Sequence, residues 1–139
     1  MYRKIMTPVD LRHTDQLGKA LKTAADLARH YDATVCYVSV AAAAPGPVGH
    51  NPQEFAEKLS VFAKQQADEH GIKTEIHPVT SHDPTTDLDD ALLKCVGDIG
   101  ADLVVMASHV PTLTDYIWPS NGGRVAGHAK ASVFVVRDA

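Results

Sequence analysis

The sequence predicts an α/β fold in which a parallel sheet of five strands is covered by helices on both sides. Segments with strand character alternate with segments of helical period along the whole chain. Residues 102–108 and 132–137 are nearly continuous apolar runs, which is typical of strands that a parallel sheet buries on both faces. Right-handed crossovers between such strands leave few topologies.

Length and charge narrow the class of protein. The chain has 139 residues, of which 45% are hydrophobic, so we expect one domain over residues 1–139 with one core. Lys and Arg number 13 against 17 Asp and Glu, which gives a net charge of -4 and argues against a nucleic-acid-binding protein. No apolar stretch is long enough for a signal peptide or a membrane span, so we expect a cytoplasmic protein without membrane contact.

The first half of the chain predicts a strand, a helix and a second strand. Residues 3–10 are a short apolar run that stops at Pro8 and Asp10, as a buried strand ending in a turn would. Residues 33–41 are rich in β-branched and aromatic side chains and predict the second strand. Between them a helix capped by Thr14 or Asp15 carries apolar residues at helical spacing: Leu17, Ala20, Leu21, Ala24, Ala28 and Tyr31.

The second half continues the alternation after a Pro- and Gly-rich loop at 42–52. A helix is expected from Pro52 to His70, with Phe55, Leu59 and Phe62 on one face and Gly71 as its stop. Residues 72–79 predict a strand whose Pro78 fits best at a sheet edge. The next helix has the cleanest period, formed by Leu88, Ala91, Leu92, Cys95, Val96 and Ile99. A short helix is expected over 124–130, between the last two strands.

Neither the cysteines nor the histidines form a metal-binding pattern. Cys36 and Cys95 stand in apolar contexts without a CxxC partner, so we expect buried free thiols. The histidines lack the spacing of a tetrahedral zinc site, and no metal ligand is assigned.

The carboxyl ends of the first and fourth strands are the expected ligand position, since open α/β sheets bind ligands where the winding direction reverses. The residues there are Pro8, Val9 and Asp10 after the first strand and 106–109 after the fourth.

Three segments carry a resemblance to a known family. KIMTPVD at 4–10, DLVVMASH at 102–109 and SNGGRVAGHAKASVFVVR at 120–137 resemble the opening, fourth-strand and closing motifs of the universal stress protein (UspA-like) family. The likeness is greatest to small single-domain members in which a Ser-His-x-Pro loop leads to a Gly-Ser-Asn turn. It implies a five-stranded doubly wound sheet of order 3-2-1-4-5 and a homodimer that pairs through the last strand, Ser132–Arg137.

The resemblance also implies a ligand, because many members bind ATP and act in stress responses rather than as efficient enzymes. An acidic residue after the first strand meets the adenine or ribose in such members, and a glycine-rich loop wraps the phosphates. The residues that the resemblance and the helix-capping pattern assign to this site are Pro8, Val9, Asp10, Val40, Met106, Ala107, Ser108, His109, Ser120, Asn121 and Gly122.

Departures from the glycine-rich motif leave the phosphate site open to two interpretations. Ala107, Val110 and Pro119 stand where motif glycines are expected, and proline has no N–H to offer a phosphate. Ser120 or Asn121 can still cap the last helix and present amides to an anion. The same residues form a common turn in which side chains satisfy only their own backbone.

Two function hypotheses remain. The first is a regulatory module that binds ATP, with or without Mg²⁺, and hydrolyses it slowly at most. In that case His109 contacts the ligand, and no catalytic residue is assigned. The second is a dimeric interaction module of the same fold that no longer binds ATP and acts through a protein partner. An apolar last strand favours dimerisation in either case, since pairing with a second copy closes an exposed sheet edge.

Overall fold

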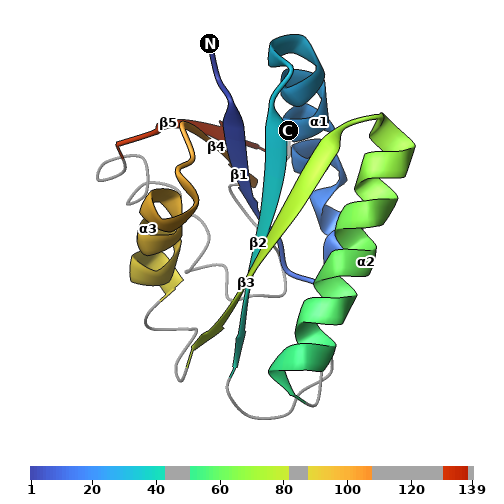
Figure 1. Cartoon of the computed structure of the whole chain (residues 1–139), viewed down its shortest axis with the longest axis vertical. Coiled ribbons are helices and arrows are strands. Elements are labelled where there is room, and N and C mark those ends of the chain that lie inside the picture. The colour runs from blue at the N-terminus through green and yellow to red at the C-terminus, as the bar shows by residue number, and fades with distance from the viewer. Residues whose placement is uncertain (43–50, 82–87, 108–129, 138–139) are drawn as a thin grey trace.

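The parallel sheet and its order are confirmed by the computed structural model, which describes residues 1–42, 51–81, 88–107 and 130–137 (Figure 1). The order is β3-β2-β1-β4-β5, and each neighbouring pair is parallel. The strands are β1 (Lys4–Pro8), β2 (Thr34–Ala42), β3 (Lys73–Ser81), β4 (Leu103–Ala107) and β5 (Ser132–Val136). The helices in these ranges are α1 (Gly18–Tyr31), α2 (Pro52–His70) and α3 (Leu88–Ile99), with a 3-10 turn η1 (Thr14–Leu17) before α1.

The helices cover both faces of the sheet. Figure 1 shows α1 and α2 against one face and α3 against the other. The chain runs outward from β1 to β2 and β3, then crosses back to place β4 beside β1. The winding direction therefore reverses between β1 and β4, which confirms the doubly wound sheet. The short helix expected over 124–130 lies outside the described residues except for Lys130, which forms a bend before β5.

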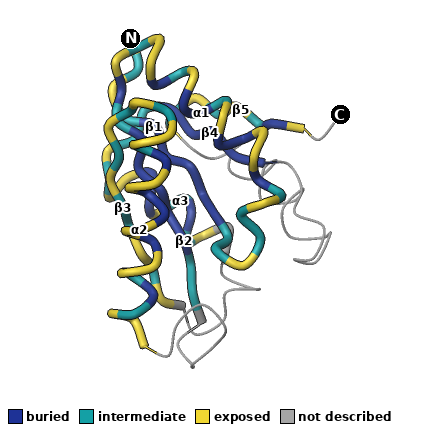
Figure 2. Tube along the Cα trace, turned by 90° about the vertical axis from the view of Figure 1, so that its right-hand side faces the viewer, coloured by how far each residue is buried: buried dark blue, intermediate teal, exposed yellow. Residues whose placement is uncertain are grey.

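Buried residues concentrate in the strands and on the inner faces of the helices (Figure 2). α1 faces the sheet with small side chains, among them Ala20, Ala24 and Ala28, which allow helix and sheet to approach closely. α2 contributes larger ones, and the Phe62 ring meets the Tyr37 ring edge-on with centroids 5.2 Å apart. α3 buries Leu92, Cys95 and Val96, as its sequence period predicts.

The ends of α2 are as expected, and the start of α1 is not. The Asn51 side chain accepts a hydrogen bond from the Glu54 amide at 2.8 Å, and Gly71 ends the helix with a φ of 64°. The expected cap of the first helix by Thr14 or Asp15 is wrong: both lie in η1, and α1 begins after Leu17 without a side-chain cap. The chain enters α1 through the backbone of this 3-10 turn instead.

The edge position expected for Pro78 is confirmed. Among the strands that the structure describes, β3 pairs only with β2 and is the outer strand of the sheet, with Pro78 opposite Ser39. An edge strand tolerates proline because one side of its backbone has no strand to bond.

Asp102 holds the amino ends of the central strands together. Its carboxylate accepts hydrogen bonds from the Arg3 amide at 2.9 Å and the Lys4 amide at 3.1 Å. Its own amide donates to the Lys4 carbonyl at 3.1 Å, and its carbonyl accepts from the Ser132 amide at 3.1 Å. One residue thus joins the starts of β1, β4 and β5.

The two cysteines are buried and free, as expected. Cys36 lies on β2 and Cys95 on α3, and burial raises the pKa of each thiol from 9.0 to about 11. Among the helices of the described ranges, none is both long and apolar enough to cross a membrane.

Replacing Asp102 with Ala should lower the free energy of unfolding by about 2 kcal/mol, because backbone amides lose a charged acceptor. Urea unfolding followed by circular dichroism measures this change. The matched control is Asp98→Ala, which removes the same charge from an exposed position of α3. A loss for Asp102→Ala no larger than for the control would contradict the role of Asp102.

The thiols should make stability fall at alkaline pH. Their raised pKa means that the unfolded chain releases these protons near pH 9.0, whereas the folded chain holds them to about pH 11. The contribution of the two thiols to the free energy of unfolding is therefore complete below pH 9.0 and is lost as the pH rises from 9.0 to about 11. Unfolding free energies measured across it should fall less steeply in the double variant Cys36→Ala/Cys95→Ala. An equal slope in the variant and the wild type would show that the thiols do not cause the fall.

Candidate functional site

The structure brings the described part of the predicted site to one edge of the sheet. Pro8 ends β1, Met106 and Ala107 end β4, and Val40 lies near the end of β2. Because all strands are parallel, these ends share the carboxyl edge. Val9 and Asp10 follow β1 directly. The other predicted residues lie outside the described ranges: Ser108, His109, Ser120, Asn121 and Gly122.

At this edge β1 is paired on one side only. β1 matches β2 along its whole length, from Lys4 opposite Thr34 to Pro8 opposite Val38. Its register with β4 covers only Ile5 opposite Leu103 and Met6 opposite Val104. The two central strands are therefore paired at their amino ends and not at their carboxyl ends.

Pro8 explains where the pairing stops. The Arg3 carbonyl and the Val9 amide bond to β2, at 3.1 and 2.8 Å, whereas the Lys4 carbonyl bonds to Asp102 on the β4 side. Backbone groups alternate in direction along a strand, so residue 8, like residue 4, faces β4. Proline has no N–H to donate there, and the β1–β4 ladder cannot continue through it.

Ser39 fixes the backbone that leads out of β1. Its buried hydroxyl donates to the Val9 carbonyl at 2.8 Å, while the Val9 amide donates to the Val38 carbonyl at 2.8 Å. Both polar groups of Val9 are thus bound to β2. The next residue, Asp10, starts from a fixed position.

Asp10 forms a compact turn with its own loop. The Asp10 carbonyl accepts from the His13 amide at 3.0 Å, and the carboxylate Oδ1 accepts from the Arg12 amide at 3.0 Å. The Arg12 guanidinium also reaches the carboxylate, with Nε 3.3 Å from Oδ1 and Nη2 3.4 Å from Oδ2. The Asp10 side chain is 10% exposed and that of Arg12 is 43% exposed. The guanidinium therefore shields the carboxylate that the sequence singled out.

Cationic residues also lie at the carboxyl edge. Lys19, in the first turn of α1, donates from Nζ to the Arg137 carbonyl at 2.6 Å, just beyond β5. Lys19 and Arg12 thus place two cationic side chains at this edge, and cationic side chains suit an anionic ligand. Within the described residues, no cluster of three His, Cys, Asp or Glu side chains is placed to hold a metal ion.

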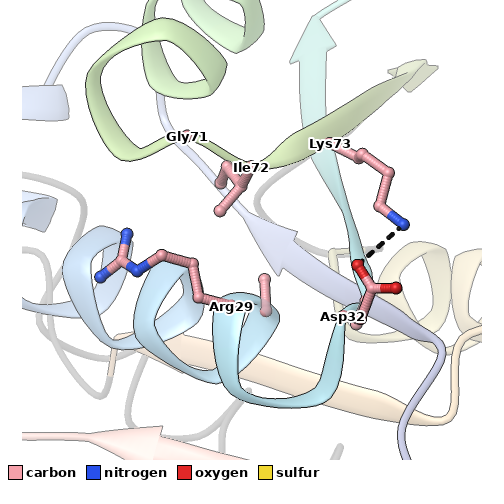
Figure 3. Close-up of a pocket in the computed structure, with 7 residues that line it drawn as sticks. Arg29, Asp32, Gly71, Ile72 and Lys73 are labelled. Atoms are coloured by element: carbon pink, nitrogen blue, oxygen red, sulfur yellow. Dashed lines mark ion pairs between the residues drawn. The ribbon is translucent and has the colours of Figure 1, made fainter.

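A pocket at the opposite, amino edge has different chemistry (Figure 3). It has a volume of about 460 Å³ and lies between the end of α1 and the start of β3, next to Arg29, Asp32, Gly71 and Lys73. Figure 3 shows Lys73 pointing toward Asp32 and the Arg29 guanidinium on the other side of the pocket. Lys73 Nζ lies 3.2 Å from Asp32 Oδ1. Arg29 donates to the His70 carbonyl at 2.8 Å.

This pocket does not suit a nucleotide phosphate. α1 and α2 both end beside it, and the carboxyl end of a helix carries partial negative charge. Lys73 pairs with Asp32 and Arg29 donates to the last carbonyl of α2, which stabilises these helix ends.

Sequence reasoning missed Arg12 and Ser39. Ser39 had a signal, since a serine hydroxyl that is buried in a mostly apolar strand costs free energy unless it is hydrogen-bonded. The sequence held no signal for Arg12, because residues two positions apart form an ion pair only in a turn such as the one that the structure shows.

Comparisons with known proteins agree with the fold. The model of the universal stress protein family matches residues 1–137. Universal stress protein G of Salmonella typhimurium is 27% identical over 148 residues, which cover 99% of this chain and 100% of that protein. A crystal structure of a universal stress protein in complex with cAMP has a TM-score of 0.69 at 23% identity, covering 97% of this chain and 96% of that one. The universal stress protein from Archaeoglobus fulgidus in complex with dAMP has a TM-score of 0.64 at 19% identity, covering 96% and 97%.

Replacing Ser39 with Ala should lower the free energy of unfolding by about 1–2 kcal/mol, since the buried Val9 carbonyl loses its donor. Thermal or urea unfolding measures the loss. Ser60→Ala on the exposed face of α2 is the control and should change stability by no more than about 0.5 kcal/mol. Equal stability of the two variants would mean that the Ser39 hydroxyl does not fix Val9.

Proposed function

The chain belongs to the universal stress protein family, and we propose that residues 1–139 form one domain that binds an adenine nucleotide and regulates a stress response. The observation that carries this proposal is the unpaired carboxyl edge between β1 and β4, with Asp10 beside it. Doubly wound sheets bind ligands at such a reversal of the winding. The relatives in complex with cAMP and dAMP support an adenine nucleotide as the ligand class.

ATP is the proposed ligand, with Mg²⁺ as a candidate companion of its phosphates. Pro8, Val9, Asp10 and Val40 would contact the adenosine part. The phosphate side would be formed by Met106, Ala107, Ser108, His109, Ser120, Asn121 and Gly122. A carboxylate such as that of Asp10 can accept hydrogen bonds from the adenine amino group or the ribose hydroxyls. We assign no catalytic residue and propose that ATP is hydrolysed slowly at most. The cytoplasmic location expected from the sequence stays a prediction.

A dimeric interaction module without ATP is the second candidate. Ala107 favours it, because this residue ends β4 where a glycine of the phosphate-binding motif is expected, and its side chain is buried. Pro119, with no N–H for a phosphate, favours it too.

A homodimer through Ser132–Arg137 is proposed with either function. β5 is the outer strand beyond β4, and Phe134 on it is 46% exposed. An apolar outer strand with an unpaired backbone edge favours pairing with a second copy.

Purified protein that is denatured should release an adenine nucleotide, or the nucleotide-free protein should bind added ATP. Replacing Asp10 with Ala should weaken binding about tenfold or more, since one charged acceptor is lost. Ion-exchange chromatography identifies the released nucleotide, and titration calorimetry gives the affinity.

Asp15→Ala is the control for this experiment, because it removes an exposed carboxylate from the same loop region. Equal ATP affinity in the Asp10 variant and the control would remove Asp10 from the site. An absence of bound nucleotide together with no binding of ATP and Mg²⁺ at millimolar concentration would favour the interaction module.

The dimer should dissociate when Phe134 is replaced with Lys, because two copies would then bring like charges to the same seam. Light scattering coupled to gel filtration measures the mass. Val61→Lys is the control, since Val61 is also an exposed apolar side chain but lies on α2. A monomer mass for the wild type at micromolar concentration would contradict the proposal.

A further inference from the structure

The ion pair between Arg12 and Asp10 lies across the proposed ligand position. The carboxylate is bound by three groups of Arg12: its amide at 3.0 Å, Nε at 3.3 Å and Nη2 at 3.4 Å. Only the amide contact follows from the backbone turn. The two guanidinium contacts depend on the side-chain conformation of Arg12, and that side chain is 43% exposed.

A ligand that hydrogen-bonds to Asp10 must compete with this guanidinium. An adenine amino group or a ribose hydroxyl needs a lone pair of Oδ1 or Oδ2, and the guanidinium donates to both oxygens. The amide bond to Oδ1 can stay, because the carboxylate has further acceptor capacity. Because the Asp10 side chain is only 10% exposed beside this guanidinium, a ligand can reach its oxygens only when the guanidinium moves, while the turn remains.

The displaced guanidinium needs a new anion. An uncharged nucleoside offers none, so its binding loses the ion pair without replacement. A nucleotide brings phosphate oxygens, to which an arginine donates charge-assisted and often bidentate bonds. The guanidinium then exchanges one anionic partner for another.

We propose that Arg12 is a displaceable lock on Asp10 that makes the site select phosphorylated adenine nucleotides over adenosine. The proposal rests on the proposed nucleotide function and adds to it the residue that sets this preference. Arg12 is a specificity residue in this account, and Asp10 is the ligand-binding residue that it covers.

The test compares the dissociation constants of adenosine and of AMP, measured by amide chemical-shift titration at low salt. Arg12→Gln removes the lock and the cation together. Arg12→Lys keeps the charge but replaces the planar fork with a single ammonium group that leaves part of the carboxylate free. Arg3→Gln is the matched control, because it removes the same charge from an exposed side chain before the other end of β1.

In Arg12→Gln, adenosine should bind about two- to fivefold more tightly, which corresponds to loss of a partly exposed ion pair. AMP should bind about tenfold more weakly, since a charge-assisted phosphate contact is lost. Arg12→Lys should bind adenosine more tightly as well but retain the preference for AMP. Arg3→Gln should match the wild type with both ligands.

A second readout follows the lock directly. The Arg12 Nε–H resonance should be distinct in the free protein, where Nε lies 3.3 Å from Oδ1, and should shift when either ligand is added. The Asp10→Ala variant identifies the resonance, because it should move there without ligand.

The possible outcomes distinguish a failure of the Arg12 lock from a failure of the nucleotide proposal. If the wild type and Arg12→Gln both bind and have the same ratio of adenosine to AMP affinity, the lock is overturned and the nucleotide proposal stands. If adenosine binding improves and AMP binding weakens in Arg12→Gln but neither changes in Arg3→Gln, the lock is supported. If adenosine and AMP bind neither to the wild type nor to any variant, the lock is overturned, and if ATP does not bind either, the nucleotide proposal is contradicted with it.

Discussion

Hydrogen bonding between β1 and β4 is the constraint on which the rest of the structure depends. These two strands are neighbours at the reversal of the winding, and their register covers only Ile5 and Met6 of β1. Asp102 fixes the amino ends with its carboxylate and its backbone. Pro8 has no N–H to extend the pairing toward the carboxyl ends. The same pair of strands is therefore closed at one edge and unpaired at the other, and the proposed site lies at the unpaired edge.

The two edges of the sheet differ in what their charged groups do. At the amino edge, Arg29 binds the last carbonyl of α2 and Lys73 pairs with Asp32, so the cations stabilise helix ends and the turn after α1. At the carboxyl edge, Arg12 contacts the carboxylate of Asp10, two residues away in the turn after β1. These guanidinium contacts do not hold a helix end, and they depend on the conformation of a side chain that is 43% exposed. This contrast is why a ligand role is proposed for Arg12 and Asp10 and not for the pocket beside Asp32.

Most of the fold could be predicted from the sequence because apolar periodicity and the helix-ending residues of α2 act locally. Leu92, Cys95 and Val96 are buried where the helical period places them. α2 begins after Asn51 and ends before Gly71. Prediction failed where backbone groups decided the outcome. α1 begins after a 3-10 turn without a side-chain cap, and Asp102 acts through amides ninety-eight and ninety-nine residues away. The candidate site divides in the same way: the position of Pro8, Asp10 and Ala107 at the carboxyl edge was predicted, and their binding role stays a prediction. The contacts of Ser39 and Arg12 depend on local backbone geometry that the sequence pattern does not specify.

The central claim is that an adenine nucleotide binds at the carboxyl edge between β1 and β4. Mapping of amide chemical shifts during titration with ATP tests it most directly, because the two edges of the sheet report separately. ATP bound at this edge should shift the amide resonances of Val9, Asp10, Arg12, Val40 and Ala107 and leave those of Gly71, Ile72 and Lys73 unchanged. Shifts confined to those last three residues, or none at millimolar ATP, would contradict it.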